Sequence, residues 1–231
     1  MITTGWPHSS ATRKTDVVDL AKGLTCSDLA DFPVELYASV GVNLDGTPVV
    51  CGGRTGTSTY SEKCYKFTNG EWEEFASMKE QRGYAAGVVY DKKLHVFGGT
   101  DGSSILQTSK TINVDGEVSD GPDLPAGVCR HAMTTINDTV SLLSGGRPNA
   151  NSYSAQTWYY NHDTGAFTSG PDLLEGRRRH GSATIVDKVT KAKIAVITGG
   201  DNSNFGKMDS TELLINGQWE TGTSGLLILF K

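Results

Sequence analysis

The stretch that decides the fold is Leu94-His95-Val96-Phe97-Gly98-Gly99, a short apolar strand that ends in two glycines. Glycine pairs also follow apolar runs at Gly52-Gly53, Gly145-Gly146 and Gly199-Gly200. The first glycines of successive pairs stand 46, 47 and 54 residues apart. A period of this length indicates a solenoid, a propeller or an array. Thr4-Gly5-Trp6, 47 residues before Gly52, marks a degraded first copy.

Further landmarks keep the same phase and predict four strands, a to d, in each unit. A turn such as Asn69-Gly70 supplies the positive φ of a two-residue hairpin. Strand a is rich in small residues, as in 85–90, which suits strands that converge on a propeller axis. Strand d carries an aromatic or apolar residue that can fill the widening gap between outer strands: Trp72, Val118, Phe167 and Trp219. Helical periodicity is almost absent, so we expect an all-β fold.

These residues make the chain resemble the kelch-repeat family over nearly its whole length. The resemblance is carried by the glycine pairs, by Tyr65 and Tyr159, by Trp72 and Trp219, and by the Arg-His-Gly/Ala segments. The sequence departs from the family at Val118, which replaces the outer tryptophan. The segment from Cys26 through Pro33 to Cys51-Gly52-Gly53 and Cys64-Tyr65 also resembles an extracellular subgroup of invertebrate kelch-like proteins.

We therefore expect a single kelch-type β-propeller domain, residues 1–231, with four full four-stranded blades and an incomplete N-terminal blade. The blades are expected at about 1–33, 34–80, 81–127, 128–177 and 178–231, and the first lacks strand a. The apolar tail Leu226–Phe230 permits two predictions of how the ring of blades ends. It either supplies the missing strand and closes a five-bladed ring, or ends a fragment of a six-bladed ring. Its bulky residues favour a fragment, whereas an open ring would leave unpaired strand edges.

The composition of the chain limits which binding partners and which cellular locations we expect. The net charge of -5 and the pI near 5.5 argue against nucleic acid, which requires a basic surface. No apolar run is long enough for a membrane helix, and the first residues lack the pattern of a signal peptide. We expect a monomer without cofactor or membrane contact, cytoplasmic as the chain stands, or extracellular if it is a piece of a secreted kelch-like protein.

The four cysteines permit two interpretations. Cys51 ends one strand b and Cys64 lies in the next strand c, so the two can be cross-strand neighbours joined by a disulfide. Cys26 and Cys129 have no evident partner. The alternative is that all four are small buried hydrophobic residues. Asn137-Asp138-Thr139 fits a glycosylation sequon, but an Asn-Asp pair between two strands is more often only a turn.

Loop arginines give the candidate binding site. In kelch propellers the d-to-a and b-to-c loops open on one face, so the resemblance implies a positive patch there. The candidate partner-binding residues are Arg54, Arg82, Arg130, Arg147, Arg179 and Tyr84, with Tyr60 and Tyr153 as further aromatic contacts. Arginine binds carboxylates in bidentate fashion, which predicts a partner protein with an acidic segment. For Arg82, Arg130 and Arg179 we favour a framework role, bonding loop carbonyls, and we expect Arg54 and Arg147 to be the contact residues.

Other chemistry is weakly indicated. His131 and His180 follow arginines but lack metal-ligand spacing, so we expect framework histidines. No catalytic motif stands out, and the prediction is a non-catalytic protein-interaction module with no catalytic or metal-binding residues. The alternative is a propeller enzyme or lectin-like protein acting on a carbohydrate, since propellers serve both purposes.

Overall fold

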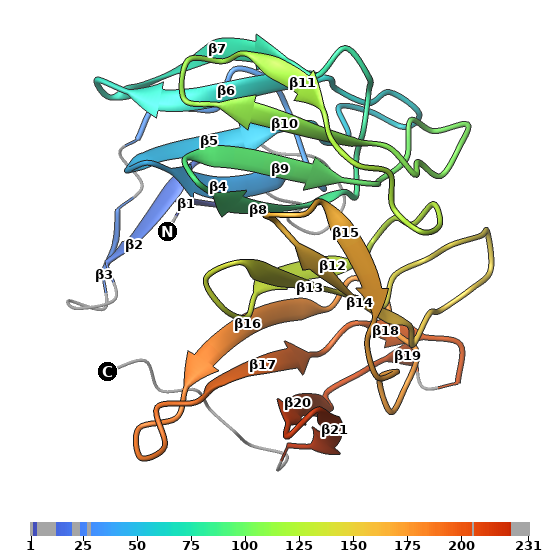
Figure 1. The fold of residues 1–231 in the computed structure, drawn as a ribbon. Helices are drawn as coiled ribbons and strands as arrows, with labels where there is room; N and C mark the ends of the chain where they lie inside the picture. The colour runs from blue at the N-terminus through green and yellow to red at the C-terminus, as the bar shows by residue number, and fades with distance from the viewer. Residues whose placement is uncertain (1, 4–12, 20–23, 27–28, 205, 223–231) are drawn as a thin grey trace.

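Short antiparallel sheets joined by loops make up the described part of the chain. The computed structural model describes residues 2–3, 13–19, 24–26, 29–204 and 206–222, which contain strands and no helix. Four sheets have four strands each and follow one another along the chain (Figure 1). The strands of each sheet pair in the order in which they occur along the chain, and only the fourth sheet is interrupted, by a small separate hairpin. This order confirms an all-β fold built from propeller blades.

The strand bounds are as follows. The first full blade contains β4 (Val40–Leu44), β5 (Thr47–Cys51), β6 (Lys63–Thr68) and β7 (Glu71–Ser77). The second contains β8 (Ala86–Tyr90), β9 (Lys93–Phe97), β10 (Ser109–Asn113) and β11 (Val118–Asp120). The third contains β12 (Ala132–Thr135), β13 (Val140–Ser144), β14 (Thr157–Asn161) and β15 (Ala166–Ser169). The fourth contains β16 (Gly181–Val186), β17 (Lys193–Thr198), β20 (Thr211–Ile215) and β21 (Gln218–Thr221).

The N-terminal blade has three strands among the described residues, at the places expected for strands b, c and d. They are β1 (Ile2–Thr3), β2 (Asp16–Asp19) and β3 (Leu24–Cys26), paired in that order. Trp72 Nε1 donates to Thr15 Oγ1 at 3.2 Å, so this sheet is tied to the first full blade. Gly5 and the tail Leu226–Phe230 lie outside the described residues. The two predicted endings, a closed five-bladed ring and a fragment of a six-bladed ring, therefore stay predictions.

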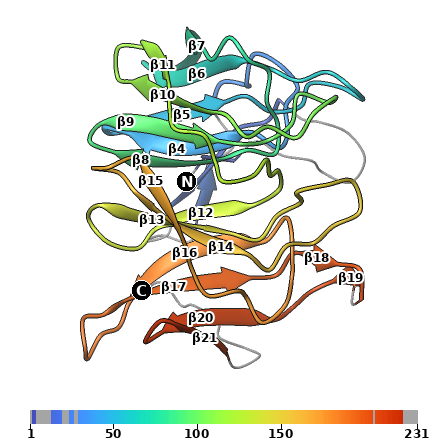
Figure 2. The same cartoon turned by 45° about the vertical axis from the view of Figure 1, so that its right-hand side comes forward.

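The first strand of each full blade lies on the inside. β4 contacts β8, β8 contacts β12, and β12 contacts β16 (Figure 2). Gly87 in β8 shows why small residues are needed here, because a β-carbon on it would lie 2.5 Å from Val40 Cγ1 in the neighbouring blade. The strand-a composition is therefore a packing requirement of the axis.

Outer strands and turns also match the sequence pattern. Trp72 lies in β7 and Trp219 in β21, both buried, whereas Phe167 in β15 packs partly buried against the core between the second and third blades. Asn69 and Gly70 adopt φ of 53° and 87° in the two-residue turn between β6 and β7. The longer third step, which leads to Gly199, comes in part from the turn 187–192 between β16 and β17, since the second blade has only a two-residue connection there. A small hairpin, β18 (Asp201–Asn202) with β19 (Gly206–Lys207), decorates the fourth blade.

The cross-strand cysteine prediction is confirmed. Cys51 in β5 pairs directly with Cys64 in β6, and the two form a disulfide with their α-carbons 4.1 Å apart. Both side chains are buried. Cys129 is a buried free thiol, and burial, as the largest influence, raises its pKa. The side chain of Cys26 lies outside the described part of the structure.

Candidate functional site

Four equivalent loop residues form a hydrogen-bonded series around the inner ends of the blades. Ala38, Tyr84, Arg130 and Arg179 each precede strand a and adopt φ between 56° and 60°. Tyr84 N donates to Ala38 O at 2.8 Å, Arg130 N to Tyr84 O at 2.8 Å, and Arg179 N to Arg130 O at 2.9 Å. A left-handed conformation is strained for residues other than glycine and is concentrated at functional sites. The bonds between blades hold this strained series in place.

The side chains of this series surround a hollow at the axis, which we call the axial hollow. Its volume is about 480 Å³. It is lined by Tyr37, Ala38, Ser39, Tyr84, Ala85, Arg130, His131, Arg179 and His180. Three of the six predicted partner-binding residues, Tyr84, Arg130 and Arg179, therefore meet at one place.

Arg130 is the residue at this site whose charge is least compensated. Its guanidinium carbon lies 4.5 Å from the centre of the Tyr84 ring. Its Nε is buried without a hydrogen-bond partner, and within the described part of the chain no carboxylate forms an ion pair with it. Burial, and after it repulsion by Arg179, lowers the pKa of Arg130. An uncompensated, partly desolvated guanidinium attracts an anion.

Arg178 and Arg179 share a single carboxylate. Arg178 Nε donates to Asp201 Oδ2 at 2.9 Å, and Arg179 Nη1 lies 3.5 Å from Asp201 Oδ1. Arg178 also lies over the Tyr153 ring, 4.3 Å from its centre. The Arg179 side chain remains 49% exposed. Asp201 thus compensates part of the positive charge beside Arg130 and leaves an excess.

The two arginines that follow glycine pairs lie next to the axial series. Arg147 pairs through its backbone with Cys129, and its Nε is buried without a partner. Arg54 lies between two tyrosine rings, 5.6 Å from the centre of Tyr37 and 5.7 Å from that of Tyr60, and its Nε donates to Gly56 O at 2.8 Å. The Tyr84 hydroxyl lies beside Arg54 as well. Tyr84 therefore connects Arg54 with Arg130.

The partner-binding assignment of Arg82 is wrong, because its side chain is completely buried. Its Nη1 donates to Gly98 O at 2.8 Å and to Thr108 O at 3.1 Å, and it forms an ion pair with Glu80. Its carbonyl accepts from Gly53 N at 2.8 Å, so Arg82 joins two blades. The framework role is confirmed for Arg82 alone among the three arginines considered for it. In the described residues, neither Arg130 nor Arg179 bonds a loop carbonyl through its side chain.

The true counterpart of Arg82 is Arg177, which the sequence pattern did not single out. Its side chain is also fully buried, and Nη1 donates to Gly199 O at 3.1 Å and to Ser210 O at 3.2 Å. Gly146 N donates to Arg177 O at 2.8 Å, as Gly53 N does to Arg82 O. Between them, Val128 has the equivalent backbone bond from Gly99 N but a side chain that cannot donate. The spacing from the first glycine of each pair does not contain this signal, because Arg82 and Val128 follow that glycine by 30 residues whereas Arg177 follows it by 32.

The two histidines of the axial hollow are buried and uncharged. Burial, and after it repulsion between the two rings, lowers the pKa of His131 to about 3. Burial, and after it Arg177, lowers the pKa of His180 to about 4. His180 Nε2 lies 3.0 Å from Ser144 Oγ, whereas both ring nitrogens of His131 are buried without a partner. Within the described ranges, no three His, Cys, Asp or Glu side chains are grouped to hold a metal ion.

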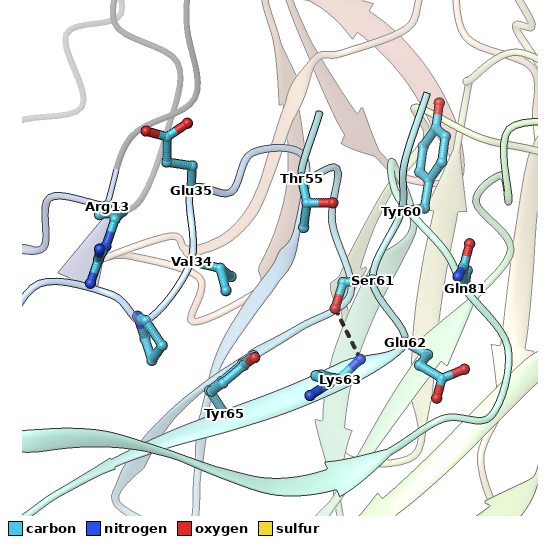
Figure 3. A pocket seen from close by; sticks show the side chains of 11 residues that line it. Arg13, Val34, Glu35, Thr55, Tyr60, Ser61, Glu62, Lys63, Tyr65 and Gln81 are labelled. Carbon is cyan, nitrogen blue, oxygen red and sulfur yellow. Dashed lines mark hydrogen bonds between the residues drawn. The ribbon is translucent and has the colours of Figure 1, made fainter. Parts of the chain in front are cut away.

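A second, larger hollow of about 760 Å³ lies beside the loop 55–63 (Figure 3). Tyr60, Tyr65, Glu62 and Gln81 contribute to its wall, and Glu35 and Arg13 stand across from them. Lys63 N donates to Ser61 Oγ at 3.1 Å, which fixes the end of the loop. Tyr60 contributes to this hollow and also flanks Arg54, so the second hollow adjoins the arginine cluster.

Comparisons with known proteins support the fold more strongly than the family. No protein-family model matches the chain. The spermatocyte protein spe-26 of Caenorhabditis elegans is 27% identical over 128 residues, which amount to 52% of this chain and 22% of that protein. The solved structure titled "Structure of YjhT" superposes with a TM-score of 0.78 at 12% identity, over 95% of this chain and 80% of the other. This likeness shows the fold alone. No helix within the described ranges is long and apolar enough to cross a membrane.

Proposed function

We propose that the chain is a kelch-type propeller that acts as a non-catalytic interaction module and binds an acidic segment of a partner protein in the axial hollow. The observation that carries the proposal is Arg130. This guanidinium is half-buried at the hollow, stacked on Tyr84, and has no anionic partner among the described residues. A protein with a net charge of -5 that gathers Arg130, Arg178 and Arg179 around a single carboxylate, Asp201, favours an anionic ligand there.

The local charge supports a carboxylate as the recognised group. Arg179, Arg147 and Arg178 each repel the Arg130 guanidinium, and Asp201 pairs with Arg178 and Arg179. A carboxylate at Arg130 would relieve the repulsion among the arginines and replace the water removed from Arg130. Hydrogen bonds to charged groups contribute about 1.5–3 kcal/mol each, so one such contact can dominate a short segment's affinity.

Stacking on Tyr84 also suits this function. A guanidinium that lies face-on to an aromatic ring keeps its in-plane N–H groups available for a carboxylate. The inter-blade bonds of the left-handed series fix the backbone of Arg130 before any ligand arrives. A fixed donor loses little entropy on binding, which increases affinity.

A selection from a displayed library of random peptides tests the proposal. We expect the peptides retained by the wild-type chain to be enriched in Asp and Glu. Arg130→Asn should lose this enrichment, since asparagine tolerates positive φ but carries no charge. Arg13→Asn, at the second hollow, is the matched control and should retain it. Equal enrichment on wild type and Arg130→Asn would refute the proposal.

A carbohydrate-directed function is the second candidate, and the second hollow favours it. Tyr60 and Tyr65 offer aromatic rings, and Glu62, Gln81 and Glu35 offer groups that bond hydroxyls (Figure 3). A glycan-array screen addresses this candidate. Binding of a glycan that becomes weaker in Tyr65→Phe or Gln81→Ala would support a carbohydrate-directed function. If no glycan on the array binds, this candidate function is excluded.

A further inference from the structure

The turn between β12 and β13 carries Asn137-Asp138-Thr139, which neither the axial hollow nor the second hollow uses. We propose that Asn137 is a site of N-linked glycosylation. Asn137 is exposed at the tip of the hairpin. The acceptor sequence Asn-x-Thr occurs here with a residue other than proline in the middle, as the transfer reaction requires.

The conformation of the turn presents the amide nitrogen of Asn137. Its side-chain Oδ1 accepts from Thr139 N at 3.0 Å and from Val140 N at 2.8 Å. The oxygen is thereby fixed against the backbone, and Nδ2 has no hydrogen-bond partner among the described residues. Thr139 O accepts from His162 N at 2.8 Å, which ties the turn to the neighbouring strand end. The folded chain therefore offers a positioned nitrogen at an accessible turn.

The reaction is a group transfer from a lipid diphosphate oligosaccharide, catalysed by a membrane-bound transferase. Asn137 Nδ2 forms a bond to the anomeric carbon of the first sugar. The bond between that carbon and the diphosphate oxygen breaks, and the lipid diphosphate leaves with the electron pair. Nδ2 gives up one of its two protons to a base and keeps the other, so no oxidant or reductant is needed.

The disulfide is an independent observation that points to the same compartment. Cys51 and Cys64 are joined by a disulfide. Such bonds form and persist in oxidising compartments, among them the lumen where secreted chains receive N-linked glycans. A chain that acquires this bond during export meets the glycosylation machinery on the same route.

The position of Asn137 keeps a glycan away from the proposed peptide site. Arg130 lies just before β12, and Asn137 lies just after it. Seven residues of extended chain at about 3.3 Å each separate the two by roughly 20 Å. A glycan at Asn137 would therefore cover the far end of the third blade and leave the axial hollow open.

The test is the intact mass of the full chain, expressed behind a cleavable export signal in eukaryotic cells and recovered from lumen and medium together. We expect a mass increment that peptide N-glycosidase removes. Asn137→Asp keeps an oxygen that accepts from Thr139 N and Val140 N, so it should fold normally and lose the increment. Thr139→Ala should lose it as well, and Thr139→Ser should retain it.

Asn151→Gln is the matched control, because Asn151 is also an exposed loop asparagine but has Tyr153 two residues later. It should retain the increment. Thermal unfolding of each variant establishes that it is folded. A wild-type chain without the increment, or an Asn137→Asp chain that still carries it, would overturn the proposal. Peptide binding at the axial hollow is a separate readout, and we expect it to be equal before and after glycan removal.

Discussion

Replacing Arg82 by methionine tests whether the buried Arg82 side chain holds the loop before β8 against the second blade. Methionine fills similar space but cannot donate. The variant leaves Gly98 O and Thr108 O without the side-chain donor that Arg82 supplies, and it removes the cationic partner of the Glu80 carboxylate. Thr108 Oγ1 still donates to Glu80 Oε2 at 2.7 Å, and Glu80 is 28% exposed, so water can compensate part of the loss.

The expected magnitude follows from these contacts. A buried acceptor left unsatisfied costs about 1–3 kcal/mol, and removing one partner of a buried ion pair costs about 3–5 kcal/mol. Because Glu80 can be rehydrated, we expect the free energy of unfolding to fall by about 3–4 kcal/mol in total. The additional change Glu80→Gln should restore part of it, since the uncompensated carboxylate disappears.

Urea unfolding followed by tryptophan fluorescence is the assay, and the chain has four tryptophans. Arg179→Met is the matched control, because its side chain is half-exposed and should change stability by less than about 0.5 kcal/mol. A loss for Arg82→Met as small as that for Arg179→Met would refute the framework role of the Arg82 side chain.

Three further predictions concern glycine, histidine and cysteine. Gly98→Ala should lower the free energy of unfolding by about 2–5 kcal/mol, because φ is +59° and the new β-carbon would lie 2.4 Å from Val128 O. Gly165→Ala, at φ +68° in open space, should cost only about 1–2 kcal/mol, and equal losses would contradict the packing argument. The free energy of unfolding should fall as pH drops from 6.5 toward 4, because the unfolded chain binds protons there while His95 (pKa about 4), His131 (about 3) and His180 (about 4) stay neutral. Each histidine contributes up to about 1.4 kcal/mol per pH unit to this loss. His131→Leu should make the free energy of unfolding depend less on pH. A free energy of unfolding that does not change with pH over this window would show that the rings are not buried as described. Unfolding without reductant should expose at most two of the four thiols, and detection of four would exclude the Cys51–Cys64 bridge.

The sequence predicted the fold well because the fold depends on residues with unusual backbone requirements. The paired glycines must adopt positive φ at close contacts, as Gly52 shows with a β-carbon position 2.4 Å from Arg82 O. Because only glycine meets this requirement, glycine pairs recur at a nearly fixed spacing that can be read from the sequence. The blade register was therefore readable from Gly52 to Gly200.

The site was predicted less completely, for two physical reasons. Three consecutive arginines, Arg177 to Arg179, made the repeat register ambiguous, and only the structure shows that Arg177 matches Arg82. The sequence also does not show which arginines have a carboxylate partner. Asp201 comes close to Arg178 and Arg179 only in the folded chain, and Arg130 has no such partner among the described residues. The difference between a framework arginine and an available one depends on these long-range contacts.

The most direct test of the central claim is the affinity of an acidic peptide from the selection for the wild-type chain and for Arg130→Asn. We expect the wild-type chain to bind the Glu-containing peptide at least about tenfold more tightly than its Gln counterpart, a difference of about 1.4 kcal/mol. The preference should decrease as salt increases and should disappear in Arg130→Asn, whose thermal unfolding should match wild type. Equal binding of the Glu and Gln peptides, or an unchanged preference in Arg130→Asn, would contradict the assignment of the axial hollow as a carboxylate site.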